Sequence, residues 1–136
     1  MKFKYDTRFT GNGFEMVPRI PVQFRNPKNG MELPIFCLVD SGATEILINT
    51  EIAKALGIQV EKGKKKLYGG IGGVMDGYQH KITMRLAGDT HEFEVSCGVL
   101  DLPMYDGLLG QNGFFDNYKV VFEKYKKRFE VTAHKP

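Results

Sequence analysis

Asp40 is the residue whose type and setting most clearly suggest chemistry. It follows the apolar segment 36–39 and precedes Ser41, Gly42 and Ala43, so a carboxylate and a hydroxyl stand at the end of a strand-like segment. Aspartate, serine and glycine are also common turn residues. An Asp-Ser/Thr-Gly tripeptide arises by chance in roughly one chain in twenty of this length, given average residue usage. Taken alone, the tripeptide leaves two interpretations open, a plain turn or a catalytic carboxylate.

A glycine-rich segment, 68–78, has the composition of a loop that lies close to a ligand. A strand-like segment follows it, whereas a phosphate-binding loop needs a following helix and, in the P-loop version, a Gly-Lys-Ser/Thr ending. We interpret it as a hairpin tip whose glycines bring backbone N–H groups close to an extended ligand. The alternative is a loose hairpin without function. The residues of this tip are Tyr68, Gly69, Gly70, Ile71, Gly72 and Gly73.

A third segment, 105–115, places two leucines before Gly110 and ends in a short apolar stretch. The pattern predicts a strand, a close backbone contact at Gly110 and then a short helical turn.

Together these three segments resemble those of the retropepsins, the single-domain aspartic proteases of retroviruses and their cellular relatives. The resemblance covers about residues 19–123, and its motifs DSGA, GGIGG and LLGQN fall in the order that the family shows. It implies an all-β fold, a closed barrel with one or two short helices, for a single domain spanning 1–136. It also implies a homodimer with Asp40 at the bottom of a cleft and the 68–78 hairpin above it as a flap.

The resemblance implies an aspartic endopeptidase that cuts extended polypeptides. Two carboxylates held about 3 Å apart share one proton, so one activates a water while the other protonates the peptide, and no metal or cofactor is needed. This chain has one Asp-Ser/Thr-Gly, since Asp76 and Asp106 precede glycine but lack the hydroxyl residue and the apolar strand. The second carboxylate must therefore come from Asp40 of a second copy, across a two-fold axis.

The same resemblance gives roles to the neighbours of Asp40. Ser41 would hydrogen-bond across the two-fold axis, and Gly42 would let the substrate backbone approach. The expected cleft walls are Leu47, Ile71 and Leu108, together with two acids that break the apolar pattern, Glu45 and Asp106. Four such carboxylates in a dimer would favour cationic side chains beside the cut bond. The alternative is that both acids point to solvent.

Two positions depart from the retroviral pattern. Many retroviral members have an aspartate where this chain has Thr44, and an arginine where it has Gln111. Because the aspartate and the arginine are both absent, neither remains as an unpaired charge. The contact between them that supports the dimer is lost, however. Residues 1–18 and 124–136 lie outside the resemblance, which therefore does not predict their part in an interface.

The remaining segments predict many short strands. Segment 14–24 reads as a strand interrupted by proline, at a sheet edge. Segment 33–39 is continuously apolar, which predicts that both its faces are covered. Segments 80–97 and 118–131 read as hairpins, and the Gly88-Asp89 pair in the first suits a two-residue turn.

One short helix is predicted at 51–57. Asn49 or Thr50 can cap its N-terminus, and Gly57 can close its C-terminus.

Composition and charge limit the partners and the compartment. With 42% hydrophobic and 26% charged residues among 136, the chain lies in the globular range. A net charge of +3 gives little support to nucleic-acid binding, and no apolar run is long enough for a membrane span. The first residues show no secretory apolar region, so a cytoplasmic protein is expected. In that compartment Cys37 and Cys97 are expected to be reduced core residues.

Two other functions stay open at this level. One is a binding module with the same dimeric fold, which holds a peptide without turnover. The other is a small β-barrel that binds nucleic acid through its lysines. The lysine runs at 62–66 and 124–128 fit better with solvated turns and a protected sheet edge, and the three histidines lack the spacing of metal ligands.

Overall fold

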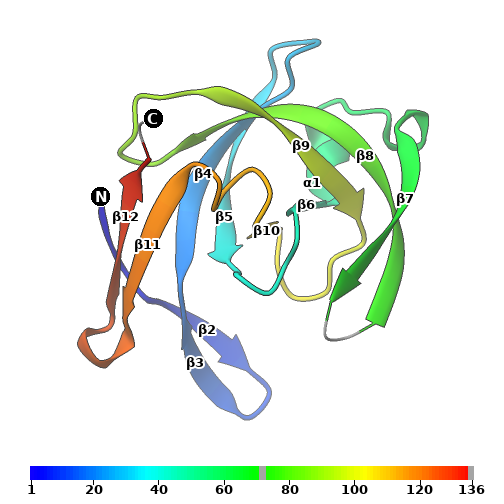
Figure 1. The fold of residues 1–136 in the computed structure, drawn as a ribbon. Coiled ribbons are helices and arrows are strands. Elements are labelled where there is room, and N and C mark those ends of the chain that lie inside the picture. The colour runs from blue at the N-terminus through cyan, green and yellow to red at the C-terminus, as the bar shows by residue number, and fades with distance from the viewer. Residues whose placement is uncertain (71–72, 135–136) are drawn as a thin grey trace.

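Most of the chain forms β-strands, as its short apolar segments predict. The computed structural model describes residues 1–70 and 73–134 (Figure 1). The described residues contain a single α-helix, α1 (Thr50–Ala55), and two short 3₁₀ turns, η1 (Val60–Lys62) and η2 (Lys124–Lys126). The all-β class is therefore confirmed. The strands are β1 (Lys2–Lys4), β2 (Asp6–Thr10), β3 (Gly13–Val17), β4 (Arg19–Arg25), β5 (Glu32–Val39), β6 (Ile46–Asn49), β7 (Lys64–Gly70), β8 (Gly73–Leu86), β9 (Phe93–Leu100), β10 (Gly107–Leu109), β11 (Tyr118–Glu123) and β12 (Arg128–Ala133).

One large sheet positions the segments that carry the sequence motifs. Its strands run in the order β4-β5-β10-β6-β9-β8-β7, and β8 pairs a second time, with β4. Most neighbours are antiparallel, but β10 is parallel to β5 and β6 is parallel to β9. Because Leu109 of β10 pairs with Val39 of β5, these two strands end side by side, and the residues that follow them meet.

Strand β4 has partners on both sides, so the expected edge position for segment 14–24 is wrong. The segment divides at Pro18 into β3 and β4, and β4 pairs with both β5 and β8. Pro21 is tolerated because the β4–β8 ladder begins one residue later, at Val22. Towards β8, Pro21 uses its carbonyl oxygen, which accepts a 3.0 Å hydrogen bond from the N–H of Ala87.

Strand β5 is buried on one face, which corrects the prediction that both faces of segment 33–39 are covered. Ile35, Cys37 and Val39 point into the core, whereas Pro34 and Phe36 are exposed. The Phe36 side chain is 54% exposed. A continuous apolar run thus hides an ordinary alternation, because here the outward positions are apolar as well.

Helix α1 forms where its capping residues predict. The Asn49 side chain accepts a hydrogen bond of 3.2 Å from the N–H of Glu51, and Gly57 follows the helix with a φ of +74°. Only glycine adopts this left-handed conformation without strain. Ala53 and Leu56 are buried beneath the helix, which fixes it against the large sheet.

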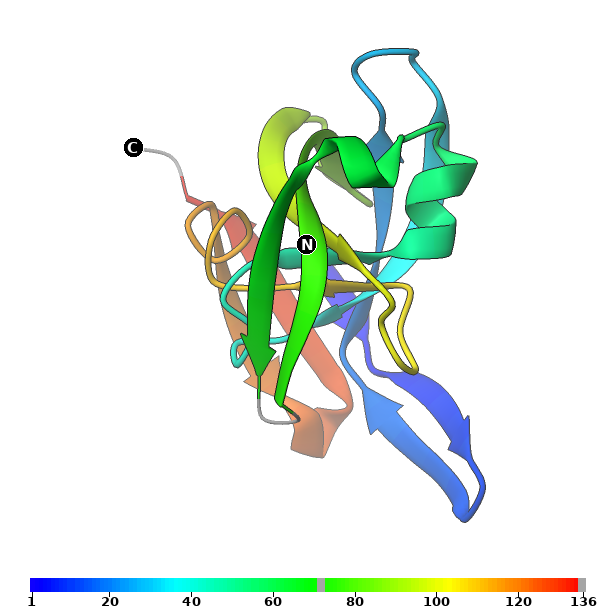
Figure 2. The same cartoon turned by 90° about the vertical axis from the view of Figure 1, so that its right-hand side faces the viewer.

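The residues outside the motif region form two smaller sheets. Strands β1, β12 and β11 make a three-stranded sheet in that order, so both ends of the chain lie together (Figure 1). Strands β2 and β3 form a separate hairpin that projects from the body of the molecule (Figure 2). Near its tip Phe9 lies opposite Phe14, and these side chains are 81% and 67% exposed.

Candidate active site

The loop after β5 presents the carboxylate of Asp40 at the mouth of a cavity. The backbone N–H of Asp40 donates to the carbonyl oxygen of Leu109 at 3.0 Å, which ties the loop to the end of β10. Its Oδ1 accepts a hydrogen bond of 2.9 Å from the N–H of Gly42. A Cβ atom at position 42 would lie 3.2 Å from that oxygen, so glycine lets the backbone wrap closely around the carboxylate. Asp40 is half-buried.

Gly110 lets the turn after β10 pass beneath the Asp40 loop. A Cβ atom at position 110 would lie 2.3 Å from the carbonyl oxygen of Glu45 and 2.7 Å from that of Ala43. Both contacts are with backbone, which cannot move aside as a flexible side chain could. The close packing that the sequence predicts at Gly110 is confirmed, although the following residues form hydrogen-bonded turns and not a helix.

Gln111 supports the Asp40 loop, a role that the sequence did not suggest. Its backbone N–H donates to the carbonyl oxygen of Ala43 at 2.9 Å, and its side-chain Nε2 donates to the carbonyl oxygen of Ser41 at 2.7 Å. The next residue, Asn112, donates its N–H to the carbonyl oxygen of Thr44 at 2.8 Å. Gln111, which stands where many retroviral members have arginine, therefore still contacts the Asp40 loop. It does so through its neutral amide, and the contact lies within a single chain.

The cavity beside Asp40 has a volume of about 280 Å³ and a mostly apolar wall. Its lining residues are Asp40, Gly42, Ala43, Leu47, Tyr68, Gly69, Gly73, Met75, Leu100, Leu102, Pro103 and Leu108. Eight of these were expected from the sequence, and Met75, Leu100, Leu102 and Pro103 were missed. Leu100 ends β9, and Leu102 and Pro103 follow it in a stretch without a motif, so apolarity was the only signal that these three residues carried.

Strands β7 and β8 form the hairpin that the sequence interprets as a flap. They pair antiparallel from Lys64 with Gln79 to Gly70 with Gly73. Gly73 has a φ of +116°, which a β-branched residue adopts only with strain. The expected flap residues Ile71 and Gly72 lie outside the described residues. Gly70 is the last residue of β7.

Tyr68 connects this hairpin to the floor of the cavity. Its side chain is 5% exposed, and its hydroxyl oxygen is buried without a hydrogen-bond partner in the described structure. The ring lies in a slot between two glycines, since a Cβ atom at Gly98 would lie 2.5 Å from its Cζ and one at Gly77 would lie 2.8 Å from its Cδ2. Burial, with the nearby negative charge of Glu45, raises the pKa of Tyr68 to about 12. The hydroxyl is therefore neutral and able to donate.

Glu45 and Asp106, which the sequence places on the cleft wall, are not among the described residues that line this cavity. The Glu45 carboxylate is bound by the ammonium group of Lys66 at 2.6 Å, so its charge is already paired by a residue of β7. Asp106 is exposed, and its backbone carbonyl accepts from the N–H of Asn49 at 2.9 Å. Ser41 is also outside the lining, and its side chain is exposed.

The buried cysteines beneath the site are structural. Cys37 and Cys97 are both buried and carry free thiols, as expected. Burial raises the pKa of the Cys97 thiol to about 12 and that of Cys37 still further. Because the thiolate is the nucleophilic form, neither residue can act as a nucleophile at neutral pH.

Residues 1–70 and 73–134 bring together no group of three or more histidine, cysteine or acidic side chains that could hold a metal ion. Over the same residues, no helix has the length and apolar character needed to span a membrane.

Comparisons with known proteins agree with this geometry. The profile of the family described as aspartyl protease matches residues 20–112. The EIAV protease in complex with the inhibitor HBY-793 is 23% identical, with a TM-score of 0.54, over 71% of this chain and 84% of that chain. A retropepsin-like aspartic protease from Rickettsia conorii is 18% identical, with a TM-score of 0.63, over 97% of this chain and 98% of that one. No curated protein sequence matches the chain.

The family match covers well over half of the chain and runs from β4, through the Asp40 loop and the β7–β8 hairpin, to the turn at Gln111. The two solved structures share its fold, in agreement with the resemblance that the three motifs suggest. This chain belongs to the aspartyl protease family and has a retropepsin-like fold.

Proposed function

We propose that two copies of this chain form an aspartic endopeptidase whose catalytic pair is Asp40 and its counterpart in the second copy. The observation that carries the proposal is the placement of one half-buried carboxylate at the mouth of an apolar cavity beneath a hairpin. A close pair of carboxylates that shares one proton offers a base for the water and an acid for the peptide at the same time, which a single carboxylate does not.

The other aspartates that precede glycine support a two-chain site. Asp106 and Asp76 are both exposed and lie outside the lining of the cavity. Asp76 pairs with Leu67 within the β7–β8 hairpin, so neither carboxylate is presented as Asp40 is. Within the described residues, a second catalytic carboxylate therefore has no source in the same chain, and a symmetric dimer supplies one.

The end of the molecule that carries Asp40 is also rich in exposed apolar side chains. Phe9 and Phe14 lie on the projecting β2–β3 hairpin, Met104 on the loop beside the cavity, and Leu67 and Val74 on the β7–β8 hairpin. In Figures 1 and 2 these two hairpins extend towards the same end of the molecule. Exposed apolar surface of this kind typically marks an interaction site, which suits both a second copy and an extended polypeptide.

The apolar lining supports a substrate preference for apolar side chains on both sides of the cut bond. Leu47, Leu100 and Leu108 line the cavity with Met75, and Lys66 already neutralises Glu45. Cleavage by this mechanism uses water and the two carboxylates alone.

The proposal is tested by replacing Asp40 with asparagine, with Asp106→Asn as a matched control. Asparagine keeps the shape of the side chain but cannot take the proton of the water. We expect Asp40→Asn to lower peptide cleavage by roughly a thousandfold or more, while Asp106→Asn cuts at the wild-type rate. Cleavage is measured on a peptide library, and the folding of each variant by circular dichroism and thermal melting.

Equal cleavage by wild type and Asp40→Asn, in protein free of contaminating protease, would contradict the proposal. A folded wild type that binds peptides but cuts none would identify the chain as a binding module with this fold.

A further inference from the structure

A second cavity, larger than the cleft, lies away from Asp40. It has a volume of about 830 Å³ and shares no lining residue with the cleft. Four segments form its walls: the turn 26–29 between β4 and β5, the stretch 57–64 between α1 and the start of β7, residues 79–81 of β8, and Glu94 of β9. In Figure 1 the β4–β5 turn and the start of β7 lie at the upper end of the molecule, opposite the tip of the β2–β3 hairpin.

Four lysines and one carboxylate line this second cavity. Lys28, Lys62, Lys64 and Lys81 come from three of these segments, and β9 contributes no lysine. The carboxylate is that of Glu94, whose Oε1 lies 3.7 Å from the ammonium group of Lys81. Within residues 1–70 and 73–134, no carboxylate oxygen lies within 4.0 Å of the other three ammonium groups. The cavity therefore has an excess of positive charge that the surrounding chain does not balance.

The segment that carries Lys62 and Lys64 is held against β8. A ring nitrogen of His80, Nε2, hydrogen-bonds the carbonyl oxygen of Val60 at 2.8 Å. A Cβ atom at Gly63, between the two lysines, would lie 2.5 Å from the carbonyl oxygen of Gln79. This close contact places the backbone between the two lysines directly against β8.

The turn that carries Lys28 is held in a similar way. The side-chain amides of Asn26 and Asn29 both donate to the carbonyl oxygen of Leu56, at 2.9 and 3.1 Å. This carbonyl belongs to the residue that ends α1. The fold thus places lysines with exposed side chains from separate segments around one cavity. An anion bound among them would reduce the repulsion between their charges.

The size and the chemistry of the lining define the class of ligand. A cavity of this volume accommodates a small molecule, and lysine binds phosphate as a compact charge with rotatable donors. The described lining has no phenylalanine, tyrosine or tryptophan on which a base could stack, and its aromatic ring, that of His80, is held by its hydrogen bond to Val60. We propose that this cavity binds a short chain of phosphate groups, such as inorganic tripolyphosphate or the triphosphate of a nucleotide, through the phosphates and not through a base.

The site also lies at the base of the β7–β8 hairpin. Lys64 and Gln79 both line the cavity, and they form the first pair of the ladder that continues to Gly70 and Gly73. A bound phosphate chain would join the base of this hairpin to the 26–29 turn.

Isothermal titration calorimetry on the full chain, near physiological salt, tests the proposal. Tripolyphosphate and ATP are each expected to bind with one site and with affinities within about threefold of each other, while adenosine does not bind. The double variant Lys62→Gln/Lys64→Gln is expected to weaken tripolyphosphate binding by about tenfold, and Lys28→Gln by about threefold. These variants change surface side chains, and thermal melting checks their folding.

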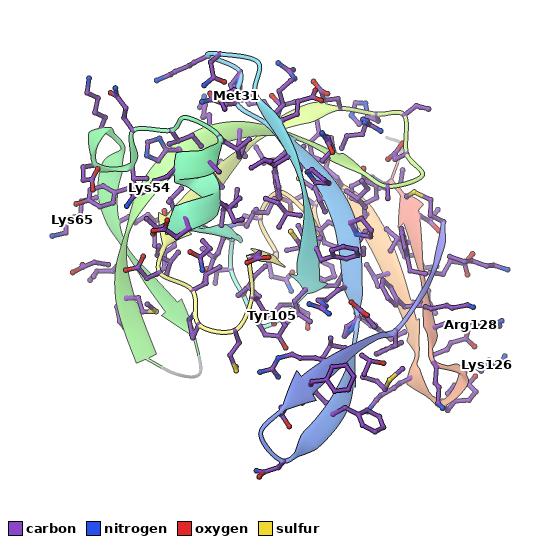
Figure 3. The ribbon with its side chains drawn as sticks, turned by 180° about the vertical axis from the view of Figure 1, so that it is seen from behind. Met31, Lys54, Lys65, Tyr105, Lys126 and Arg128 are labelled. Atoms are coloured by element: carbon purple, nitrogen blue, oxygen red, sulfur yellow. The ribbon has the colours of Figure 1, made fainter. Side chains whose placement is uncertain are left out.

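A matched control removes the same charge elsewhere. Lys124→Gln/Lys126→Gln changes the other lysine run, and Figure 3 shows Lys126 on the opposite side of the molecule from Lys54 and Lys65. This variant is expected to bind tripolyphosphate within about twofold of wild type.

Five results would overturn the proposal. Four of them are the absence of binding to wild type up to millimolar tripolyphosphate, an equal loss in the two double variants, full binding by Lys28→Gln, and tighter binding of a glutamate-rich peptide than of tripolyphosphate. Binding of ATP that is much tighter than that of tripolyphosphate would show that the base is recognised, which also contradicts it. The test does not depend on cleavage activity.

Discussion

The side-chain amide of Gln111 donates a 2.7 Å hydrogen bond to the carbonyl oxygen of Ser41. This bond joins the turn after β10 to the loop that presents Asp40, and the backbone N–H of Gln111 adds a second bond, to Ala43. A carboxylate pair acts only when its geometry is maintained, since a misplacement of about 1 Å can cost a large factor in rate. Gln111 is therefore expected to position Asp40 without contacting the substrate.

We expect Gln111→Ala to lower kcat/KM by roughly tenfold, with a loss in the free energy of unfolding of about 1 kcal/mol or less because the amide is exposed. Asn117→Ala is the matched control, since its side chain donates to the carbonyl oxygen of Gly113 at 2.7 Å in the same turn region but away from Asp40. Peptide cleavage and urea unfolding of both variants measure the two effects. Equal kcat/KM values for the two variants would contradict the role of Gln111.

Gly98 is expected to be required by the ring of Tyr68. A Cβ atom there would lie 2.5 Å from Cζ of Tyr68 and 2.9 Å from a methyl carbon of Leu47. Gly98→Ala should therefore lower the free energy of unfolding by about 1–3 kcal/mol through overpacking. In a Tyr68→Ala background the same change should cost at least about 1 kcal/mol less, because the ring is gone. Urea unfolding of the four proteins measures this coupling. An equal loss in the free energy of unfolding from Gly98→Ala in both backgrounds would contradict the close packing of the Tyr68 ring against Gly98.

The bond between Tyr118 and Asp89 gives the fold a dependence on pH. The Tyr118 hydroxyl donates to Oδ2 of Asp89 at 2.7 Å, and the N–H of His91 donates to Oδ1 at 3.0 Å. Burial raises the pKa of Asp89, but these hydrogen bonds lower it more, so the pKa in the folded protein lies below the ordinary value of 3.8. A carboxylate of this kind contributes stability above its unfolded pKa and loses it as the pH falls through the folded pKa.

Tyr118→Phe is therefore expected to lower the free energy of unfolding by about 1 kcal/mol at pH 7, and the difference from wild type should shrink below about pH 4. Tyr125→Phe is the control, since Tyr125 donates to the carboxylate of Glu123 at the exposed surface. Chemical unfolding is measured at pH 7 and pH 3. If the free energies of unfolding of wild type and Tyr118→Phe differ by the same amount at pH 7 and pH 3, the effect of Tyr118 does not depend on the charge of Asp89.

Local signals in the sequence predicted those parts of the fold that local chemistry determines. Asn49 and Gly57 bound the helix because each satisfies a requirement of the helix end. Segment 118–131 forms a hairpin because its two alternating halves flank a polar turn. The connection between β8 and β9 was harder to predict. It spans 87–92 and is longer than the two-residue turn expected at Gly88-Asp89, and within it Asp89 accepts a hydrogen bond from Tyr118, far along the chain.

Partners distant in sequence account for what the sequence did not predict at the site. Glu45 was expected to face the cleft, but Lys66 of β7 pairs with it. The sequence around either residue gives no indication of this ion pair. Leu102 and Pro103 line the cavity because β9 ends beside it. From the sequence, Gln111 indicates only the loss of an ion pair. In the structure its side-chain amide contacts the carbonyl oxygen of Ser41 in the same chain.

The central claim, that each active site needs Asp40 from two chains, is tested most directly by mixing. Wild-type protein at a fixed concentration, high enough to be paired, is incubated with increasing amounts of Asp40→Asn chains, and cleavage is followed. With random pairing, equal amounts should leave about half of the activity, and a ninefold excess about a tenth. A ninefold excess of Asp106→Asn chains, the control, should not lower it. Activity that stays unchanged at a ninefold excess of Asp40→Asn, although sedimentation shows that the chains exchange, would contradict a site shared between two copies.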